Sequence, residues 1–184
     1  MDIDLRRPSP ADRELIRRMM ELYLYDFSEF EGDDLDEHGL YGFPYLDYFW
    51  HEPTHAAFIV TVDQRLAGFA LIDNRVVIEG NERSMAEFFV LRKYRRRGVG
   101  ATVATRIFTE LPGAWEVRVV PNNLPAQAFW RKVIAAYTAG QYTEVALDSD
   151  AWIGPAFCPD HELWMAFFRD PDANLLALMC EVRE

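Results

Sequence analysis

The sequence predicts an α/β fold, in which a mixed β-sheet carries helices on its faces. Short apolar runs with the residue types of strands alternate with longer segments whose apolar residues recur every three or four positions. This alternation is typical of helices packed on a sheet. Of the 184 residues, 50% are hydrophobic, which is enough for one domain with a true core.

The first elements can be placed in order. Residues 2–6 read as a strand, and Ser9 is positioned to cap a helix that runs from about Pro10 to Phe27. One face of this helix is expected to carry Leu15, Ile16, Met19, Leu22 and Tyr23. Two strands follow at 57–62 and 65–72, and a tight turn at Asp63 and Gln64 joins them.

The second half continues the pattern. A strand at 84–91 is followed, in order, by a helix at 99–111, a strand at 115–120, a helix at 124–136 and a strand at 142–147. Asn123 is a suitable N-cap for the second of these helices, and Pro125 suits its first turn.

Two unusual segments separate the first helix from the strand pair. Residues 26–37 hold seven acids, and residues 41–50 hold six aromatic side chains, with Pro44 placed to start a short helix. Carboxylates attract a polyamine or another cation, and aromatic faces bind ammonium groups. The alternative is a solvated acidic loop followed by aromatic residues of the core. The acids are Asp26, Glu29, Glu31, Asp33, Asp34, Asp36 and Glu37.

A basic, glycine-containing turn follows the strand at 84–91. Its five cations are Arg92, Lys93, Arg95, Arg96 and Arg97, and Gly98 and Gly100 come directly after them. Glycines let the backbone approach a ligand, and the free N–H groups of the following helix point at it. Arginines add charge-assisted bonds to phosphate oxygens. The order strand, turn, helix therefore predicts an anion site.

The stretch Val90–Gly100 also resembles the acetyl-CoA signature of the GNAT acetyltransferases, which reads Arg/Gln-x-x-Gly-x-Gly/Ala after a strand that ends in Val. The resemblance implies that backbone N–H groups from Arg96 to Ala101 hold the pyrophosphate of CoA. It further implies that Val90 and Leu91 lie along the pantetheine arm.

A second segment, Asn123–Lys132, resembles the later GNAT motif Asn-x-x-Ala-x-x-Phe-Tyr-x-Lys. The likeness covers roughly residues 1–155 and implies a mixed, mostly antiparallel central sheet. The cofactor-binding residues that it implies are Val90, Leu91, Arg95, Arg96, Arg97, Gly98, Val99, Gly100, Ala101, Asn123, Phe129 and Trp130.

Acetyl transfer to an amine needs a base, an oxyanion donor and help for the departing thiolate. The resemblance implies that the oxyanion donor is a backbone N–H near Val90 or Leu91. Glu87, an acid in an apolar strand, is the candidate base, and the alternative is a carboxylate at a sheet edge capped by an arginine.

The leaving-group position departs from the family pattern, since Trp130 stands where the motif usually carries Tyr. An indole N–H donates a hydrogen bond but is no usable acid. Tyr137 or Tyr142 then protonates the thiolate, or the thiolate leaves without protonation, or the protein binds CoA without turnover. We take Tyr137 as the catalytic candidate.

The last residues form a separate prediction. Residues 156–184 are expected to form a β-hairpin extension of the acetyl-CoA-binding domain 1–155, with a turn at 170–174. This tail resembles the final hairpin of a glyoxalase-like domain. Ala177 stands where that family commonly has a metal-binding Glu, and His161 is the nearest remaining ligand candidate. We therefore expect no metal site.

Net charge and the lack of long apolar runs exclude some partners and locations for the protein. The net charge of −11 argues against a nucleic-acid partner, which needs a basic surface. No apolar run approaches the ~20 residues of a membrane helix, and the N-terminus lacks the apolar core of a signal peptide. We expect a cytoplasmic protein with Cys158 and Cys180 as reduced thiols.

The residues and the resemblance together predict an N-acetyltransferase that uses acetyl-CoA as cosubstrate and a small, cationic amine as acceptor. One alternative is a catalytically silent module that binds acyl-CoA and has a regulatory role. Another is a glyoxalase-like metalloprotein. Whether the chain forms a homodimer is left open.

Overall fold

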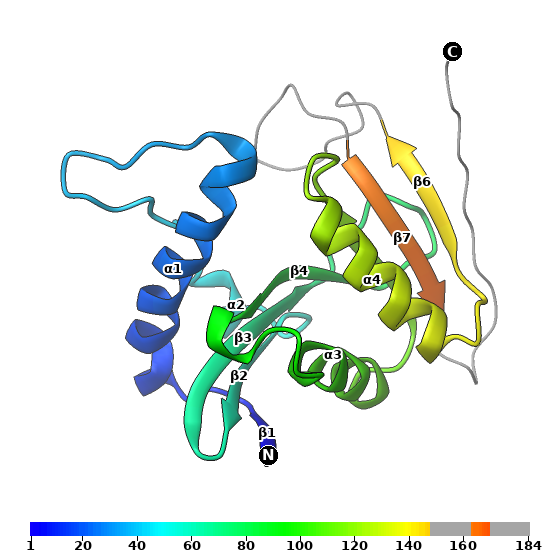
Figure 1. The fold of residues 1–184 in the computed structure, drawn as a ribbon, viewed down its shortest axis with the longest axis horizontal. Coiled ribbons are helices and arrows are strands. Elements are labelled where there is room, and N and C mark those ends of the chain that lie inside the picture. The colour runs from blue at the N-terminus through cyan, green and yellow to red at the C-terminus, as the bar shows by residue number, and fades with distance from the viewer. Residues whose placement is uncertain (148–162, 170–184) are drawn as a thin grey trace. The chain divides into compact units, whose positions relative to one another are not determined.

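The computed structural model describes residues 1–147 and 163–169, and they fall into two compact units. Unit 1 comprises Met1–Asp73 and Glu87–Val103. Unit 2 comprises Asn74–Ala86 and the described residues from Ala104 onward. Strand β4 and helix α3 (Figure 1) each contribute residues to both units.

Unit 1 contains a run of strands in the order β1-β2-β3-β4. Strands β1 (Ile3–Arg6), β2 (Ala56–Val62) and β3 (Arg65–Asp73) pair antiparallel, and β4 spans Arg83–Val90. The turn between β2 and β3 has left-handed backbone at Asp63 and Gln64, with φ of 49° and 62°. Two consecutive positive φ values are the mark of the type I′ hairpin turn, so the predicted tight turn is confirmed.

A β-bulge lies on β3 near the end of β4. Val60 pairs with Gly68 and Thr61 pairs with Leu66, so Ala67 has no partner on β2. The Ala67 carbonyl instead accepts the Leu91 N–H at 2.8 Å. At Gly68 a Cβ would lie 2.0 Å from the Phe89 carbonyl oxygen, so this close approach of two backbones requires glycine.

Helix α1 (Arg13–Glu31) is longer than the sequence predicted and follows a short 3-10 turn over Pro10–Asp12. It ends at Gly32, whose φ of 76° suits a left-handed C-cap. The helix contacts β3 (Figure 1). Its buried face was predicted wrongly at one position: Leu22 is 50% exposed. The buried apolar residues are Ile16, Met19, Met20 and Leu24.

The acidic stretch is therefore not one loop, because residues 26–31 belong to α1 and only the later acids lie in the loop that follows. Helix α2 (Tyr48–His51) starts four residues after Pro44 rather than at it. The intervening residues form tight turns, in which Tyr48 N–H donates to the Tyr45 carbonyl at 3.1 Å. Leu46 and Phe49 are buried, so part of the aromatic segment belongs to the core.

Unit 2 has the strand order β4-β5-β7-β6. Strand β5 (Ala114–Val119) pairs parallel with the start of β4 and antiparallel with β7 (Leu163–Arg169), and β7 pairs antiparallel with β6 (Thr143–Leu147). Helix α4 (Leu124–Tyr137) contacts β5 and β7, as Figure 1 shows. These pairings confirm a mixed, mostly antiparallel sheet.

The N-cap predicted for α4 is confirmed. The Asn123 side-chain oxygen accepts the Ala126 N–H at 3.1 Å, and Pro125 occupies the first turn. Helix α3 (Val99–Glu110) and the strands of the second half begin and end within one residue of their predicted bounds.

Only the first strand of the predicted C-terminal hairpin lies among the described residues. It is β7, and it lies between β5 and β6. The turn at 170–174, the strand predicted after it, His161 and both cysteines lie outside the described residues, so the hairpin stays a prediction.

A buried carboxylate holds the connection from β3 to β4 in unit 2. Glu116 on β5 is fully buried and accepts the Val77 N–H at 3.1 Å and the Asn81 amide at 3.2 Å. Its pKa is raised by burial, although the nearby Arg118 and these hydrogen bonds oppose the rise. The carboxylate therefore supplies the Val77 N–H with a partner and fixes this part of the loop.

Candidate active site

The basic turn begins as a 3-10 turn over Arg92–Tyr94 and leads into α3. Arg96 and Gly98 both have left-handed backbone, with φ of 59° and 81°. The Gly98 carbonyl accepts the Thr102 N–H at 3.0 Å, so it closes the first turn of α3. The N–H groups of the next three residues, Val99, Gly100 and Ala101, then have no partner within the helix. The turn has the free donors that an anion site requires.

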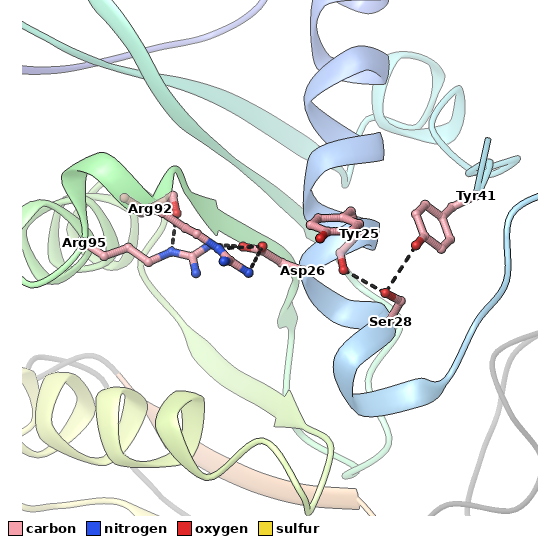
Figure 2. Close-up of polar contacts among 7 residues, drawn as sticks. Tyr25, Asp26, Ser28, Tyr41, Arg92 and Arg95 are labelled. Atoms are coloured by element: carbon pink, nitrogen blue, oxygen red, sulfur yellow. Dashed lines mark hydrogen bonds and ion pairs between the residues drawn. The ribbon is translucent and has the colours of Figure 1, made fainter. Parts of the chain in front are cut away.

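Two of the arginines in the turn are held by Asp26 on α1. Figure 2 shows Arg92 and Arg95 converging on this carboxylate. Arg92 donates from Nε at 2.9 Å, and Arg95 donates from Nη2 to the second carboxylate oxygen and from Nε to the Val90 carbonyl at 2.6 Å. The positive charges of the two arginines thus compensate the charge of Asp26, so Asp26 does not add to the negative field predicted for the acidic stretch.

The remaining two arginines differ from this pair. Arg96 and Arg97 are exposed, and neither makes a side-chain hydrogen bond or ion pair with another residue of the described part of the chain. They are the better candidates for direct contact with phosphate. Of the three arginines assigned to the cofactor, Arg95 is already engaged with protein groups.

The end of β4 places Glu87, Val90 and Leu91. The Leu91 N–H is used in the bond to Ala67, so of the two predicted oxyanion donors the N–H of Val90 is the better candidate. Glu87 accepts a hydrogen bond from the phenol of Tyr23 on α1. Burial raises the pKa of Tyr23 well above its ordinary value, and the charge and hydrogen bond of Glu87 raise it further. Tyr23 therefore remains a neutral donor to the carboxylate.

Aromatic rings surround this hydrogen bond. The Tyr23 ring lies 5.2 Å from Phe27, 6.0 Å from Phe69 and 5.8 Å from Phe89, measured between ring centroids. Phe69 and Phe89 are buried. Rings in edge-to-face contact fix one another's orientation, so they hold the Tyr23 hydroxyl toward Glu87.

Glu31 carries a second carboxylate near Tyr23, close enough for its charge to raise the Tyr23 pKa. One carboxylate oxygen of Glu31 is buried and has no hydrogen-bond partner in the described part of the chain. Burial, together with the negative charge of Asp33, raises the pKa of Glu31 to about 7. A bound cation would supply the partner that this carboxylate lacks.

The returning end of the loop after α1 is pinned to the helix. Glu21 accepts the backbone N–H groups of Tyr41 at 2.8 Å and Gly42 at 3.1 Å. The Tyr41 hydroxyl donates to Ser28 Oγ at 3.3 Å, as Figure 2 shows. At the tip, Asp36 accepts the His38 and Leu40 N–H groups, so it builds the loop. Its exposed neighbours Asp33, Asp34 and Glu37 remain available to a ligand.

The residues of the second motif lie in unit 2. Asn123 caps α4, Phe129 is half-buried, and Trp130 is buried with its ring 6.3 Å from Phe108. The Tyr137 ring packs 5.3 Å from Phe108. Trp130 therefore belongs to an aromatic core.

The two tyrosines considered for protonation of the thiolate differ. The Tyr142 hydroxyl donates to Glu144 at 3.1 Å, and burial together with this bond raises its pKa. A higher pKa makes Tyr142 a weaker acid, which counts against it as the proton donor to the thiolate.

Three residues of the candidate site could not be singled out from the sequence: Tyr23, Asp26 and Glu31. Tyr23 reads as one more apolar position on a helix, yet its partner Glu87 lies 64 positions later. Asp26 and Glu31 read as members of an acidic run. Only the packing of α1 against β3 and the end of β4 distinguishes them.

The fold, with a basic turn that leads into α3, is shared by a class of transferases that take an acyl group from a CoA thioester. The chain belongs to the acetyltransferase (GNAT) family, whose model matches residues 16–134. It is therefore an acetyl-CoA-dependent acyltransferase, and both motif resemblances are confirmed at the level of the family. The glyoxalase-like likeness of the tail finds no support. No curated protein is a significant sequence match to this chain.

Solved structures share the fold at low identity. An acetyltransferase from Thermus thermophilus matches with a TM-score of 0.62 and 18% identity, covering 90% of this chain and 96% of that one. The spermidine N-acetyltransferase of Vibrio cholerae with CoA and spermine matches with a TM-score of 0.60 and 12% identity, covering 91% and 95%. The ribosomal-protein-S18-alanine N-acetyltransferase of Escherichia coli matches with a TM-score of 0.58 and 13% identity, covering 94% and 97%.

Within 1–147 and 163–169, no three His, Cys, Asp or Glu side chains group as a metal site would. No helix in this part of the chain has both the length and the hydropathy to span a bilayer.

Proposed function

We propose that the protein transfers the acetyl group of acetyl-CoA to a small cationic amine. The turn from Arg96 to Ala101 binds the phosphates of CoA, and the end of β4 receives the pantetheine arm. The observation that carries the acceptor class is Glu31, a half-buried carboxylate with one unpartnered oxygen and a raised pKa. A second ammonium group on the acceptor would pair with it, while the reacting nitrogen lies near Glu87.

The chemistry follows from the same groups. An ammonium cannot attack, so Glu87 accepts its proton, directly or through a water. The neutral nitrogen then attacks the thioester carbonyl, and the Val90 N–H is placed to donate to the oxyanion. The C–S bond breaks and Tyr137 donates a proton to the departing thiolate. The acetylated nitrogen loses its second proton, which restores the Tyr137 hydroxyl. The Tyr23 hydroxyl holds the Glu87 carboxylate in place for the first step.

Release of CoA thiol tests the proposal against a panel of acceptors: spermidine, a primary monoamine, an uncharged aromatic amine and a peptide with N-terminal alanine. We expect the polyamine to give the highest kcat/KM. Turnover of the peptide alone would contradict the acceptor class. Binding of acetyl-CoA without turnover of any amine would instead identify a silent CoA-binding module, the alternative that the buried Trp130 motivates.

Glu31→Gln should stabilise the protein without ligand above neutral pH. The raised pKa means that the folded protein binds more protons than the unfolded chain between about pH 4.5 and 7. Stability is therefore lost as pH rises through that window. The melting temperature of the variant should be about 2 °C above that of wild type at pH 8 and equal to it at pH 4. The shift is small because solvent still screens the carboxylate.

The same variant should raise the KM for a polyamine about tenfold at pH 8, since a charge-assisted bond is lost. Glu29→Gln, at an exposed carboxylate on the same helix, is the control for the melting experiment. Equal melting temperatures of Glu31→Gln and wild type at pH 8, with an unchanged KM, would remove Glu31 from the acceptor site.

The exposed acids of the loop after α1 should attract a cationic acceptor through their electrostatic field. Replacing Asp33, Asp34 and Glu37 by their amides should raise the polyamine KM at low salt and flatten its salt dependence, because exposed charges are screened over about 10 Å at ~0.1 M. Asp36 is left intact because it builds the loop.

The control removes the same charge elsewhere in unit 1, at the exposed Asp4, Glu14 and Glu52. Steady-state KM values between about 20 mM and about 300 mM salt provide the measurement, with ~0.1 M near the middle of the screened range. Equal behaviour of the two triple variants would show that only net charge matters.

A further inference from the structure

Asp26 connects α1 with the basic turn through both of its carboxylate oxygens. Arg92 donates from Nε to Oδ1 at 2.9 Å, its Nη2 lies 2.7 Å from the same oxygen as an ion pair, and Arg95 reaches Oδ2. The Asp26 side chain is only 16% exposed, whereas those of Arg92 and Arg95 are 68% and 41% exposed. A mostly buried carboxylate thus holds two arginines that would otherwise extend into solvent.

Arg95 is held at a second point, because its Nε donates to the Val90 carbonyl at 2.6 Å. The next residue is Arg96, whose left-handed backbone is unfavourable for a residue with a Cβ. Such a conformation persists where the surrounding structure determines it. The two bonds of Arg95 fix the chain directly before the strained residue, so they determine the path of the turn.

We propose that Asp26 is a positioning residue for acetyl-CoA. It holds Arg92 and Arg95, and through them it sets the turn so that Arg96, Arg97 and the first N–H groups of α3 face the phosphates. Asp26 itself does not contact the cofactor. The inference rests on the proposed function, in which this turn binds CoA.

If Asp26 instead hindered the binding of acetyl-CoA, its removal would have the opposite effect on affinity. A carboxylate beside a phosphate site could compete for the same arginines, and its removal would then tighten CoA binding and add cations to the site. The double engagement of Arg95 favours the positioning role, since its guanidinium is already fixed by two protein groups.

Titration calorimetry with acetyl-CoA tests the inference. Asp26→Asn should raise the Kd about tenfold, because charge-assisted bonds that order the turn are lost. The slope of log Kd against log salt should stay that of wild type, since Arg96 and Arg97 remain. In turnover, KM for acetyl-CoA should rise while kcat stays near wild type.

A matched control is available in the same unit. Asp12 makes a two-bond pair with Arg6 at 2.9 and 2.7 Å, and its side chain is 18% exposed, close to that of Asp26. Asp12→Asn should leave the Kd for acetyl-CoA unchanged. This control separates loss of an ion pair in general from loss of this one.

A double-mutant cycle shows whether Asp26 acts through Arg92. Arg92→Gln should weaken the binding of acetyl-CoA. The double variant should have the same Kd as whichever single variant binds less tightly, because both changes break the same contact. Arg92→Gln also provides the test if Asp26→Asn does not fold.

The inference is overturned if Asp26→Asn binds as wild type does, or if it binds more tightly with a steeper salt slope. A wild type that does not bind acetyl-CoA would overturn the proposed function, and this inference with it.

Discussion

Glu87→Gln is expected to lower kcat by roughly a hundred- to ten-thousandfold, the usual range for one positioned base. The amide keeps the size of the side chain but cannot accept the ammonium proton. The Tyr23 hydroxyl can still donate to the amide oxygen, so the packing of α1 against β4 should persist. The Kd for acetyl-CoA should therefore stay near that of wild type. Single-turnover rates and calorimetry measure the two quantities separately.

Tyr23→Phe is the companion variant. It keeps the ring that contacts Phe27, Phe69 and Phe89 and removes only the hydroxyl. Losing a hydrogen bond to the charged carboxylate disfavours the charged form, so the acidic limb of the pH–rate profile should move to higher pH. Full activity and an unmoved profile in Glu87→Gln would show that Glu87 is structural.

Gly98→Asp is expected to weaken the binding of acetyl-CoA by at least about a hundredfold. The φ of 81° at Gly98 is tolerated by Asn and Asp better than by other residues with a side chain, and a Cβ there meets nothing within 4 Å. The fold should therefore accept either residue. Asp adds a negative charge where phosphate is expected, whereas Asn adds the same volume without the charge.

The comparison of Asp with Asn at this position separates electrostatics from shape. Gly98→Asn should bind acetyl-CoA about tenfold more weakly than wild type. Gly98→Asp should bind at least a further tenfold more weakly, because repulsion between its charge and a phosphate costs ~1.4 kcal/mol of binding free energy. Gly140→Asp is the control, since Gly140 has a φ of 82° and equally open space. Equal affinities of the two Gly98 variants would show that no phosphate approaches this glycine.

Elements that depend on local signals could be predicted from the sequence. The Asp63–Gln64 turn, the Asn123 cap and the order of strands and helices follow from residues close together in the chain. The start of α2 was wrong by four residues because tight turns, not a helix, follow Pro44. The extra turn of α1 was missed because its acids resemble a loop.

The candidate site was predictable where a motif encodes it and not elsewhere. The basic turn is contiguous, so its residues could be named in advance. The pairing of Asp26 with Arg92 spans 66 positions, and that of Tyr23 with Glu87 spans 64. Such contacts depend on how α1 packs in unit 1, which no local pattern encodes.

The position of β7 has a consequence for the order in which the chain can fold during synthesis. β7 lies between β5 and β6, although it follows both in the sequence. Until residues 163–169 leave the ribosome, β5 keeps an open edge on that side, and β6 lacks the strand it pairs with in the described structure. Unpaired edges recruit strands from other molecules. A nascent chain that has emerged from the ribosome only as far as residues 148–162 would therefore expose both strands, and β7 protects them by pairing with β5 and β6.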